Sequence, residues 1–200
     1  MKVLFVCGSP RRHGNTTDVM RMVADEVAER YDVEFTHLAG DPIHGCRGCR
    51  HCWNNVDEPG CCQKDKISGL LDKVLEADVL VYGSPCYGHS FSAEMNAFMN
   101  RHFALLKYLV DEDPWARNKG RIQSLVEGKK AGFIGTCQGP VEGNADLLLL
   151  QFDRFCDRLQ LDPFGKYIFP WASWNAQEAH WSKDGIRRIV DDVEQIAQYL

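Results

Sequence analysis

Short apolar strands that alternate with amphipathic helical segments predict a doubly wound α/β fold for this chain. Five strand candidates rich in β-branched residues are each followed by a segment whose apolar residues recur with helical spacing. This alternation is typical of a parallel sheet covered by helices on both faces. Two hundred residues fit one domain with a sizeable core, and no linker or repeat marks a second one. We therefore predict a single domain, residues 1–200, built on a five-stranded parallel sheet.

The predicted strands and helices alternate along the chain. The strand candidates are Lys2–Cys7, Val33–Leu38, Val79–Gly83, Lys130–Thr136 and Pro163–Phe169. The helix candidates between them are Thr17–Tyr31, Lys66–Ala77, Ser92–Tyr108 and Asn144–Gln160. Apolar residues spaced by three and four from Ile186 to Leu200 predict a closing helix with one stripe facing the sheet. A cysteine-rich loop at 39–65 and a polar insertion at 109–128 are longer than ordinary connections, and such loops are usually functional or disordered.

Composition limits the partners of the chain and its compartment. The 44% hydrophobic and 26% charged residues are typical of a soluble globular domain. A net charge of −5 argues against nucleic acid as a partner, and the longest apolar runs are too short to cross a membrane. The chain opens without a signal-peptide pattern, so we expect a cytoplasmic protein. In that compartment nine cysteines are expected to be thiols, metal ligands or cluster ligands rather than disulfides.

The segment 8–16, Gly-Ser-Pro-Arg-Arg-His-Gly-Asn-Thr, connects the first strand to the first helix. A polar loop bounded by glycines at this place presents backbone N–H groups and the positive end of a helix to an anion. Its spacing fits neither the nucleotide-hydrolase loop, since Asn15 stands where the lysine belongs, nor the dinucleotide fingerprint. The loop suits a single phosphate monoester, and an ordinary turn that binds nothing is the alternative. The candidate phosphate ligands are Ser9, Arg11, Asn15, Thr16 and Thr17.

Two further loops follow the third and fourth predicted strands. The first, 83–90, contains Pro85, Cys86, Tyr87 and Gly88, which combine a sharp turn with an aromatic side chain. The second, 135–140, is small, polar and flexible. Ligands of open α/β sheets bind beyond the carboxyl ends of the strands, where all three loops emerge. Each of these two loops alone is an ordinary turn, but together with the phosphate loop they predict a pocket for a planar mononucleotide, with FMN as the candidate.

These motifs resemble those of the NADPH-dependent FMN reductase-like branch of the flavodoxin-like fold, and within it the iron–sulfur flavoproteins. The matching segments are 8–16, 46–52 and 83–93. The resemblance implies that the flavin carries the redox chemistry. The sequence itself shows no convincing Ser-His-Asp set or pair of carboxylates, so we assign no side chain as an acid–base catalyst. The resemblance also implies an FMN site with the phosphate on Ser9, Arg11, Asn15 and Thr16, and the ring between Pro85, Cys86, Tyr87 and Gly88 on one side and Thr136, Gln138 and Gly139 on the other.

The cysteine-rich loop carries a C-x₂-C-x₂-C run, and after eight intervening residues a pair of adjacent cysteines follows. This spacing lets thiolates converge on one centre, and three of them with a fourth from nearby would bind a [4Fe–4S] cluster. Free thiols and a zinc site are the alternatives. We prefer Cys61 to Cys62 as the fourth ligand, since it sits nearer the family spacing and follows the freely turning Gly60. The predicted ligands are Cys46, Cys49, Cys52 and Cys61.

Three classes of function remain open from the sequence. The first is an FMN-dependent oxidoreductase that draws electrons from NAD(P)H or a ferredoxin and passes them to a small acceptor. The second is a non-enzymatic electron carrier, or a sensor in which the cysteines of 46–62 report oxidation. The third is a zinc-stabilised binding protein that has lost its flavin. A homodimer or homotetramer is expected, because the long loops and a tail with Trp171, Trp174 and Trp181 could cover a neighbouring subunit's site.

Overall fold

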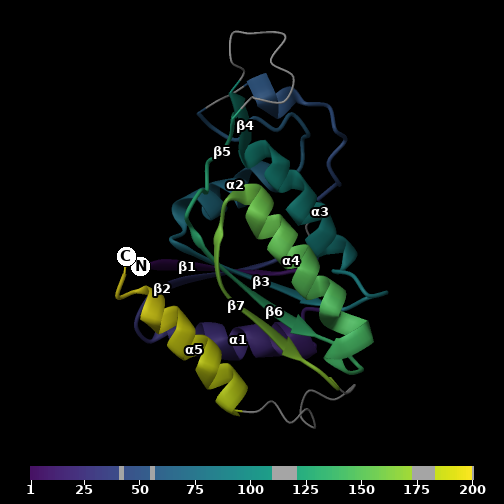
Figure 1. Cartoon of the computed structure of the whole chain (residues 1–200), viewed down its shortest axis with the longest axis vertical. Coiled ribbons are helices and arrows are strands. Elements are labelled where there is room, and N and C mark those ends of the chain that lie inside the picture. Colours follow the sequence, from purple (N-terminus) through teal and green to yellow (C-terminus); the bar gives the residue numbers. More distant parts are fainter. Residues whose placement is uncertain (41–42, 55–56, 110–120, 173–182, 200) are drawn as a thin grey trace.

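A five-stranded parallel sheet forms the centre of the molecule (Figure 1). The computed structural model describes residues 1–40, 43–54, 57–109, 121–172 and 183–199. The strands lie in the order β2-β1-β3-β6-β7, with bounds β1 Lys2–Cys7, β2 Asp32–His37, β3 Val79–Pro85, β6 Lys130–Thr136 and β7 Asp162–Phe169. This is the strand order of flavodoxin-like sheets, so the predicted fold class is confirmed.

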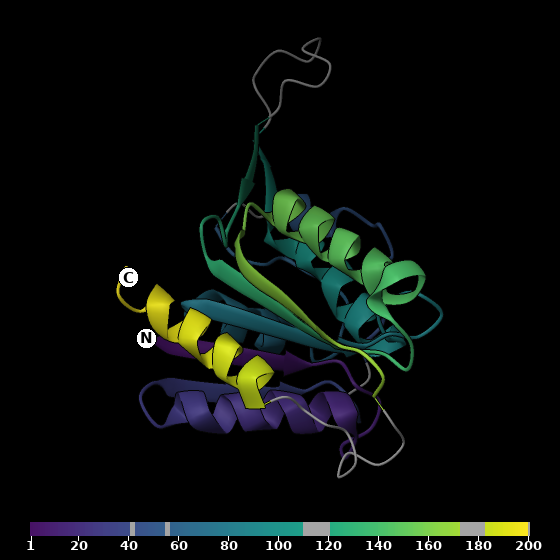
Figure 2. The same cartoon turned by 60° about the horizontal axis from the view of Figure 1, so that its bottom comes forward.

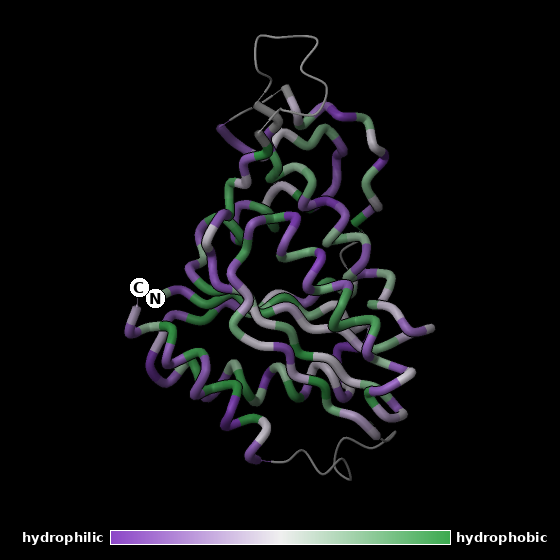
Figure 3. The backbone as a smooth tube through the Cα atoms, viewed as in Figure 1, coloured by the Kyte–Doolittle hydropathy of each residue, from purple (hydrophilic) through white to green (hydrophobic). Residues whose placement is uncertain are grey.

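Helices cover both faces of the sheet (Figures 1 and 2). On one face lie α1 (Asn15–Ala28) and α5 (Lys183–Ile196), and on the other lie α2 (Ile67–Glu76), α3 (Ala93–Arg101) and α4 (Asp146–Leu159). Along α5, hydrophobic and hydrophilic residues alternate with the turns of the helix, as expected for one buried stripe (Figure 3). Among the described residues, none of the helices combines the length and the apolar character that a membrane span requires.

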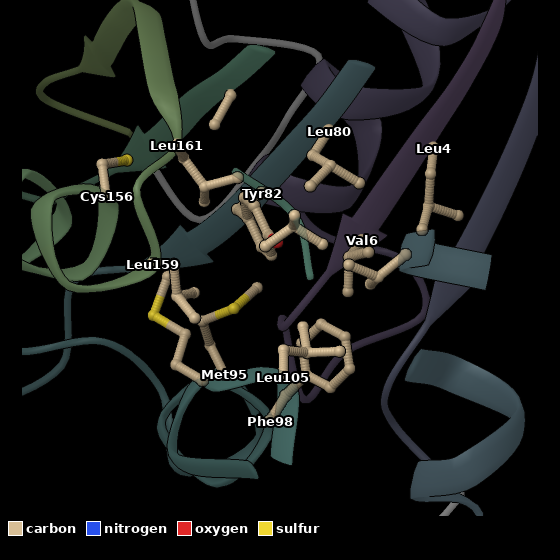
Figure 4. Close-up of a cluster of buried hydrophobic side chains, with 14 of the residues drawn as sticks. Leu4, Val6, Leu80, Tyr82, Met95, Phe98, Leu105, Cys156, Leu159 and Leu161 are labelled. Atoms are coloured by element: carbon tan, nitrogen blue, oxygen red, sulfur yellow. The ribbon is translucent and has the colours of Figure 1, made fainter. Parts of the chain in front are cut away.

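The three central strands β1, β3 and β6 are mostly apolar because each faces a core on both sides. In β1, Val3 and Phe5 belong to the core under α1 and α5, whereas Leu4 and Val6 point to the opposite core. Every residue of β3 is buried. Figure 4 shows the second core, in which Tyr82 of β3 lies among side chains from α3, α4 and the segment that follows α3. Two separate cores thus fix the strands, and with them the loops at the carboxyl edge.

One predicted helix is wrong over its second half. The segment Ser92–Tyr108 was expected to be helical throughout, but α3 ends at Arg101. A short 3₁₀ turn, His102–Leu105, leads into the strand β4 (Leu106–Leu109), which pairs antiparallel with β5 (Arg121–Ser124). The pairing partner lies beyond residues 110–120, where no local pattern could reveal it.

Other differences are confined to element ends. Helix α1 begins at Asn15, two residues before the predicted start, and β3 continues through Pro85. The last helix ends at Ile196 instead of Leu200. Cys7 and Cys156 are buried in the core, as residues of an apolar strand and a packed helix should be. Part of the predicted insertion at 109–128, together with Trp174 and Trp181, lies outside the described residues.

Candidate functional site

An open pocket of about 260 Å³ lies at the carboxyl ends of β1, β3 and β6, where the three predicted loops meet. Nine of the twelve residues predicted to bind the cofactor line it: Ser9, Arg11, Asn15, Thr16, Pro85, Cys86, Tyr87, Thr136 and Gln138. The other three, Thr17, Gly88 and Gly139, lie in the same loops but do not line the pocket. Gly14, Cys137 and Ala172 line it without having been predicted.

The loop after β1 is held in place by hydrogen bonds to its own backbone. The carbonyl oxygen of Arg11 accepts a hydrogen bond from Thr17 Oγ1 at 2.7 Å and another from Ser9 Oγ at 3.1 Å. His37 at the end of β2 adds a third donor, Nε2, at 3.1 Å. The backbone N–H of Ala39 donates to Nδ1 of the same ring, so the ring proton is on Nε2. Thr17 is fully buried and therefore supports the loop from the interior of the protein.

The first turn of α1 points its backbone N–H groups at the pocket. Gly14 caps the helix with an extended backbone and no side-chain capping bond, so Asn15 and Thr16 occupy the first two helical positions. Backbone N–H groups of a first turn have no partner within the helix, and the helix dipole makes that end positive. The hydroxyls of Thr16 and Thr136 lie 2.6 Å apart, which joins the start of α1 to the end of β6. The arrangement favours an anion at this end of the pocket.

A tight turn after β3 forms one wall of the pocket. The backbones of Tyr87 and Ser90 exchange both hydrogen bonds, at 2.9 and 3.1 Å. Gly88 and His89 between them have positive φ angles of 56° and 61°, as a two-residue type I′ turn requires. Gly88 therefore shapes the turn, while Tyr87, 46% exposed, lies beside the pocket. The N–H of Cys86 donates to the carbonyl of Thr136 at 2.8 Å and keeps this wall against the end of β6.

The opposite wall is formed by the chain after β6 together with the chain after β7. The N–H of Cys137 donates to the carbonyl of Phe169, and the N–H of Ala172 donates to the carbonyl of Cys137 at 2.9 Å. Parallel pairing thus continues past the strand ends and brings Ala172 to the pocket. The place of Ala172 at the pocket could have been inferred from the adjacency of β6 and β7. Burial raises the pKa of the thiols of Cys86 and Cys137, so both are neutral near pH 7.

A second hollow, of about 420 Å³, lies on the other side of the β1 loop. The described residues of its lining are mostly apolar and include the carboxylate of Glu94. A phosphate would be repelled there, whereas the first pocket offers Arg11 and the start of α1. The smaller pocket is therefore the better place for a phosphate-bearing ligand.

The cysteine-rich loop packs beside α3 and carries its own small hollow. All four predicted ligands, Cys46, Cys49, Cys52 and Cys61, line this hollow together with Cys62. The sulfurs of Cys49 and Cys62 lie 3.7 Å apart. A hydrogen bond from the backbone of His51 lowers the pKa of Cys49, while burial raises that of Cys52. In the part of the chain that the structure describes, no three Cys, His, Asp or Glu side chains stand in an arrangement that would hold a metal ion.

The comparison with known families agrees with these loops. A family model for NADPH-dependent FMN reductases matches residues 1–151, which contain all three motif segments. The chain belongs to this family. The resemblance inferred from the motifs is thereby confirmed.

Curated relatives of the chain are iron–sulfur flavoproteins. One from Methanocaldococcus jannaschii is 37% identical over 102 residues, which is 50% of this chain and 51% of the relative. One from Archaeoglobus fulgidus is 30% identical over 102 residues, covering 50% and 45%. The chain thus spans about half the length of these relatives. A second protein from M. jannaschii is 23% identical over 195 residues, covering 98% of this chain and 89% of the relative.

Solved structures show the same fold at low sequence identity. RosB with a bound riboflavin-phosphate intermediate has a TM-score of 0.73 and 16% identity, covering 100% of this chain and 80% of RosB. An FMN-dependent NADH-azoreductase from Bacillus anthracis in complex with FMN has a TM-score of 0.68 and 11% identity, covering 98% and 100%. At such identities the likeness supports the flavodoxin-like fold alone.

Proposed function

We propose that the protein is an FMN-binding oxidoreductase whose cofactor occupies the pocket between the loops after β1, β3 and β6. The observation that carries the proposal is the meeting of nine predicted ligand residues, from three separate loops, in one pocket. Membership of the NADPH-dependent FMN reductase family supports the choice of FMN. FMN, when bound, supplies the electron-transfer chemistry.

The residues of the chain bind and orient the cofactor in this proposal. The phosphate lies at the start of α1, where backbone N–H groups, the hydroxyl of Thr16 and the guanidinium of Arg11 serve an anion. The ring lies between Tyr87 and the segment that contains Gln138. The neutral thiols of Cys86 and Cys137 keep additional negative charge away from the ring. No side chain is assigned a role as acid–base catalyst.

We further propose that NADH or NADPH is the electron donor and that a quinone, a flavin, a metal ion or an oxygen species is the acceptor. Steady-state assays test this with purified, FMN-loaded protein, reduced nicotinamide and a quinone or ferric acceptor. Turnover is the expected result. FMN uptake without turnover would favour the alternative of an electron carrier or thiol sensor, with ferredoxin as a possible partner. A preference for FAD over FMN would contradict the assignment of the pocket itself.

The cysteine-rich loop is proposed to bind one [4Fe–4S] cluster through Cys46, Cys49, Cys52 and Cys61. Two observations support it: the thiols line one hollow, and the curated relatives carry the name iron–sulfur flavoprotein. The thiols fit a cluster in kind, number and location, and binding requires that their sulfurs turn toward one point. Protein prepared without air should contain about four irons per chain. Protein that stays free of iron after anaerobic reconstitution would leave only the flavin site.

A homodimer in the cytoplasm completes the proposal. Large apolar side chains are exposed near the pocket on the turn after β3 and on α4: Tyr87 at 46%, Leu147 at 49% and Leu150 at 51%. Aromatic and aliphatic residues of this kind anchor subunit interfaces. Sedimentation at micromolar concentration is expected to show a species of twice the 22.7 kDa chain mass or more. A single species of 22.7 kDa would contradict it.

A further inference from the structure

Two cationic side chains are buried beneath the cysteine-rich loop. Arg101 is the last residue of α3 and Lys107 lies in β4, and each is only 1% exposed. Lysine and arginine are almost never fully buried unless a partner holds them. Neither residue is among the described residues that line the two pockets at the carboxyl edge. The two cations therefore need a separate explanation.

Arg101 connects one buried carboxylate to one cysteine sulfur. Its two terminal nitrogens, Nη1 and Nη2, donate to Asp65 at 2.6 and 3.1 Å. Nη1 also donates to the carbonyl of His44 at 2.7 Å, and Nη2 donates to the sulfur of Cys61 at 3.1 Å. The remaining donor, Nε, is buried and has no hydrogen-bond partner in the described part of the chain. The guanidinium thus offers more donors than a partnership with Asp65 requires.

Lys107 binds the backbone of two residues that line the hollow, Cys52 and Ala104. Its Nζ donates to the backbone carbonyls of Glu58 at 2.7 Å, Ala104 at 3.1 Å and Cys52 at 3.4 Å. The ammonium is thereby fixed under the backbone of one predicted ligand, as the guanidinium of Arg101 is fixed against the sulfur of another. The hollow lined by five cysteines thus has Arg101 in its lining and the Lys107 ammonium on the carbonyls of two lining residues, and this positive charge suits an anionic occupant.

We propose that Arg101 is a positioning residue of the cysteine site that makes Cys61 the fourth cluster ligand, while Lys107 holds the backbone of Cys52. This rests on the cluster proposed above. An iron–sulfur cluster bound by four thiolates is an anion, and hydrogen bonds to its sulfurs tune its potential. The fork of Arg101, paired with Asp65, holds the Cys61 sulfur in the hollow through a hydrogen bond from Nη2. The sulfur of Cys62, an exposed residue, lies against Cys49 instead.

The test compares cluster retention and potential in matched variants after anaerobic reconstitution with ferrous iron and sulfide. Arg101→Lys keeps a positive charge next to Asp65. The single ammonium of lysine, however, cannot donate two parallel hydrogen bonds to the carboxylate and a third to the sulfur of Cys61. Arg154→Lys is the control, since that side chain is 77% exposed on α4. A double variant, Arg101→Gln with Asp65→Asn, removes both charges together and covers the case in which the single variant fails to fold. FMN uptake and circular dichroism report the fold.

For Arg101→Lys, the chelator concentration that removes half of the iron should fall about ten- to a hundredfold. The midpoint potential of the cluster should become more negative, because a hydrogen bond from a cation to a ligand sulfur is lost. Cys62→Ser should keep its iron and Cys61→Ser should lose it. Wild-type retention and potential in a folded Arg101→Lys or double variant, or the reverse result at the two cysteines, would overturn the role of Arg101 alone. Wild-type protein without iron would overturn the cluster and this role together, while FMN binding would stand.

Discussion

Replacing Arg11 by alanine is expected to weaken FMN binding about ten- to a hundredfold, with the fold intact. A charge-assisted hydrogen bond contributes about 1.5–3 kcal/mol, and the guanidinium of Arg11 is a cation that lines the pocket. The loop should survive, because Ser9, Thr17 and His37 all bind the backbone carbonyl of residue 11, which alanine retains. Fluorescence titration of apoprotein with FMN measures the change.

The neighbouring arginine provides the control for this prediction. Arg12 extends away from the pocket, and its Nη2 donates to the carbonyl of Ala39 at 2.9 Å. Arg12→Ala removes the same charge from the same loop, so its FMN affinity should stay within a few-fold of wild type. Equal losses in both variants would mean that only the overall charge of the loop matters. An Arg11→Ala protein with normal affinity would remove the phosphate from this end of the pocket.

Acidification from pH 7 toward pH 4 is expected to cost the protein about 3 kcal/mol of stability through His102 alone. The ring is fully buried, and burial lowers its pKa from 6.5 to about 4. Its Nδ1 donates to the carbonyl of Phe98 at 2.9 Å, so its Nε2 accepts from the hydroxyl of Tyr82 at 3.1 Å. The hydrogen bond from Tyr82 requires the neutral ring, whereas the bond to Phe98 is kept when Nε2 takes up a proton.

The direction of this pH effect follows from the number of protons that the folded and the unfolded chain bind. Between pH 6.5 and about 4 the unfolded chain takes up a proton at His102 that the folded chain does not. The contribution of His102 to the free energy of unfolding is therefore fully present above pH 6.5 and is lost as the pH falls toward 4. Urea unfolding at several pH values measures the slope, and His102→Gln should flatten it. His89→Gln, which removes an exposed imidazole, is the control; a slope equally flat in that variant would contradict the assignment to His102.

The sequence predicted the elements whose stabilising contacts are local or repeated. Strands buried on both faces, such as β3, begin with an apolar run and stand out against the helices. The segment after α3 was misread because Leu106 forms its pairs with Ser124, and pairing between distant segments leaves no local period. The early start of α1 was missed as well, because Gly14 caps the helix without a side chain that would mark its beginning.

The site was predictable where chemistry and position coincide. Arg11, Thr16 and Gln138 are polar residues of the segments that follow strands of a parallel sheet, and all of them line the pocket. Thr17 has the same chemistry, but its hydroxyl is turned to the backbone of Arg11, which only the three-dimensional structure reveals. Ala172 has no polar side chain, so its place depends entirely on the pairing of the chain after β7 with the chain after β6.

The three hydrogen bonds that converge on the carbonyl of Arg11 bear on the kinetics of cofactor exchange. All three donors belong to the protein, so the loop has its shape before any ligand arrives. The entropic cost of ordering the loop is then met during folding and does not slow association. Amino-acid changes at the pocket should accordingly leave the association rate nearly constant and change the dissociation rate. The residence time of FMN is therefore the quantity that substitutions in this loop would alter.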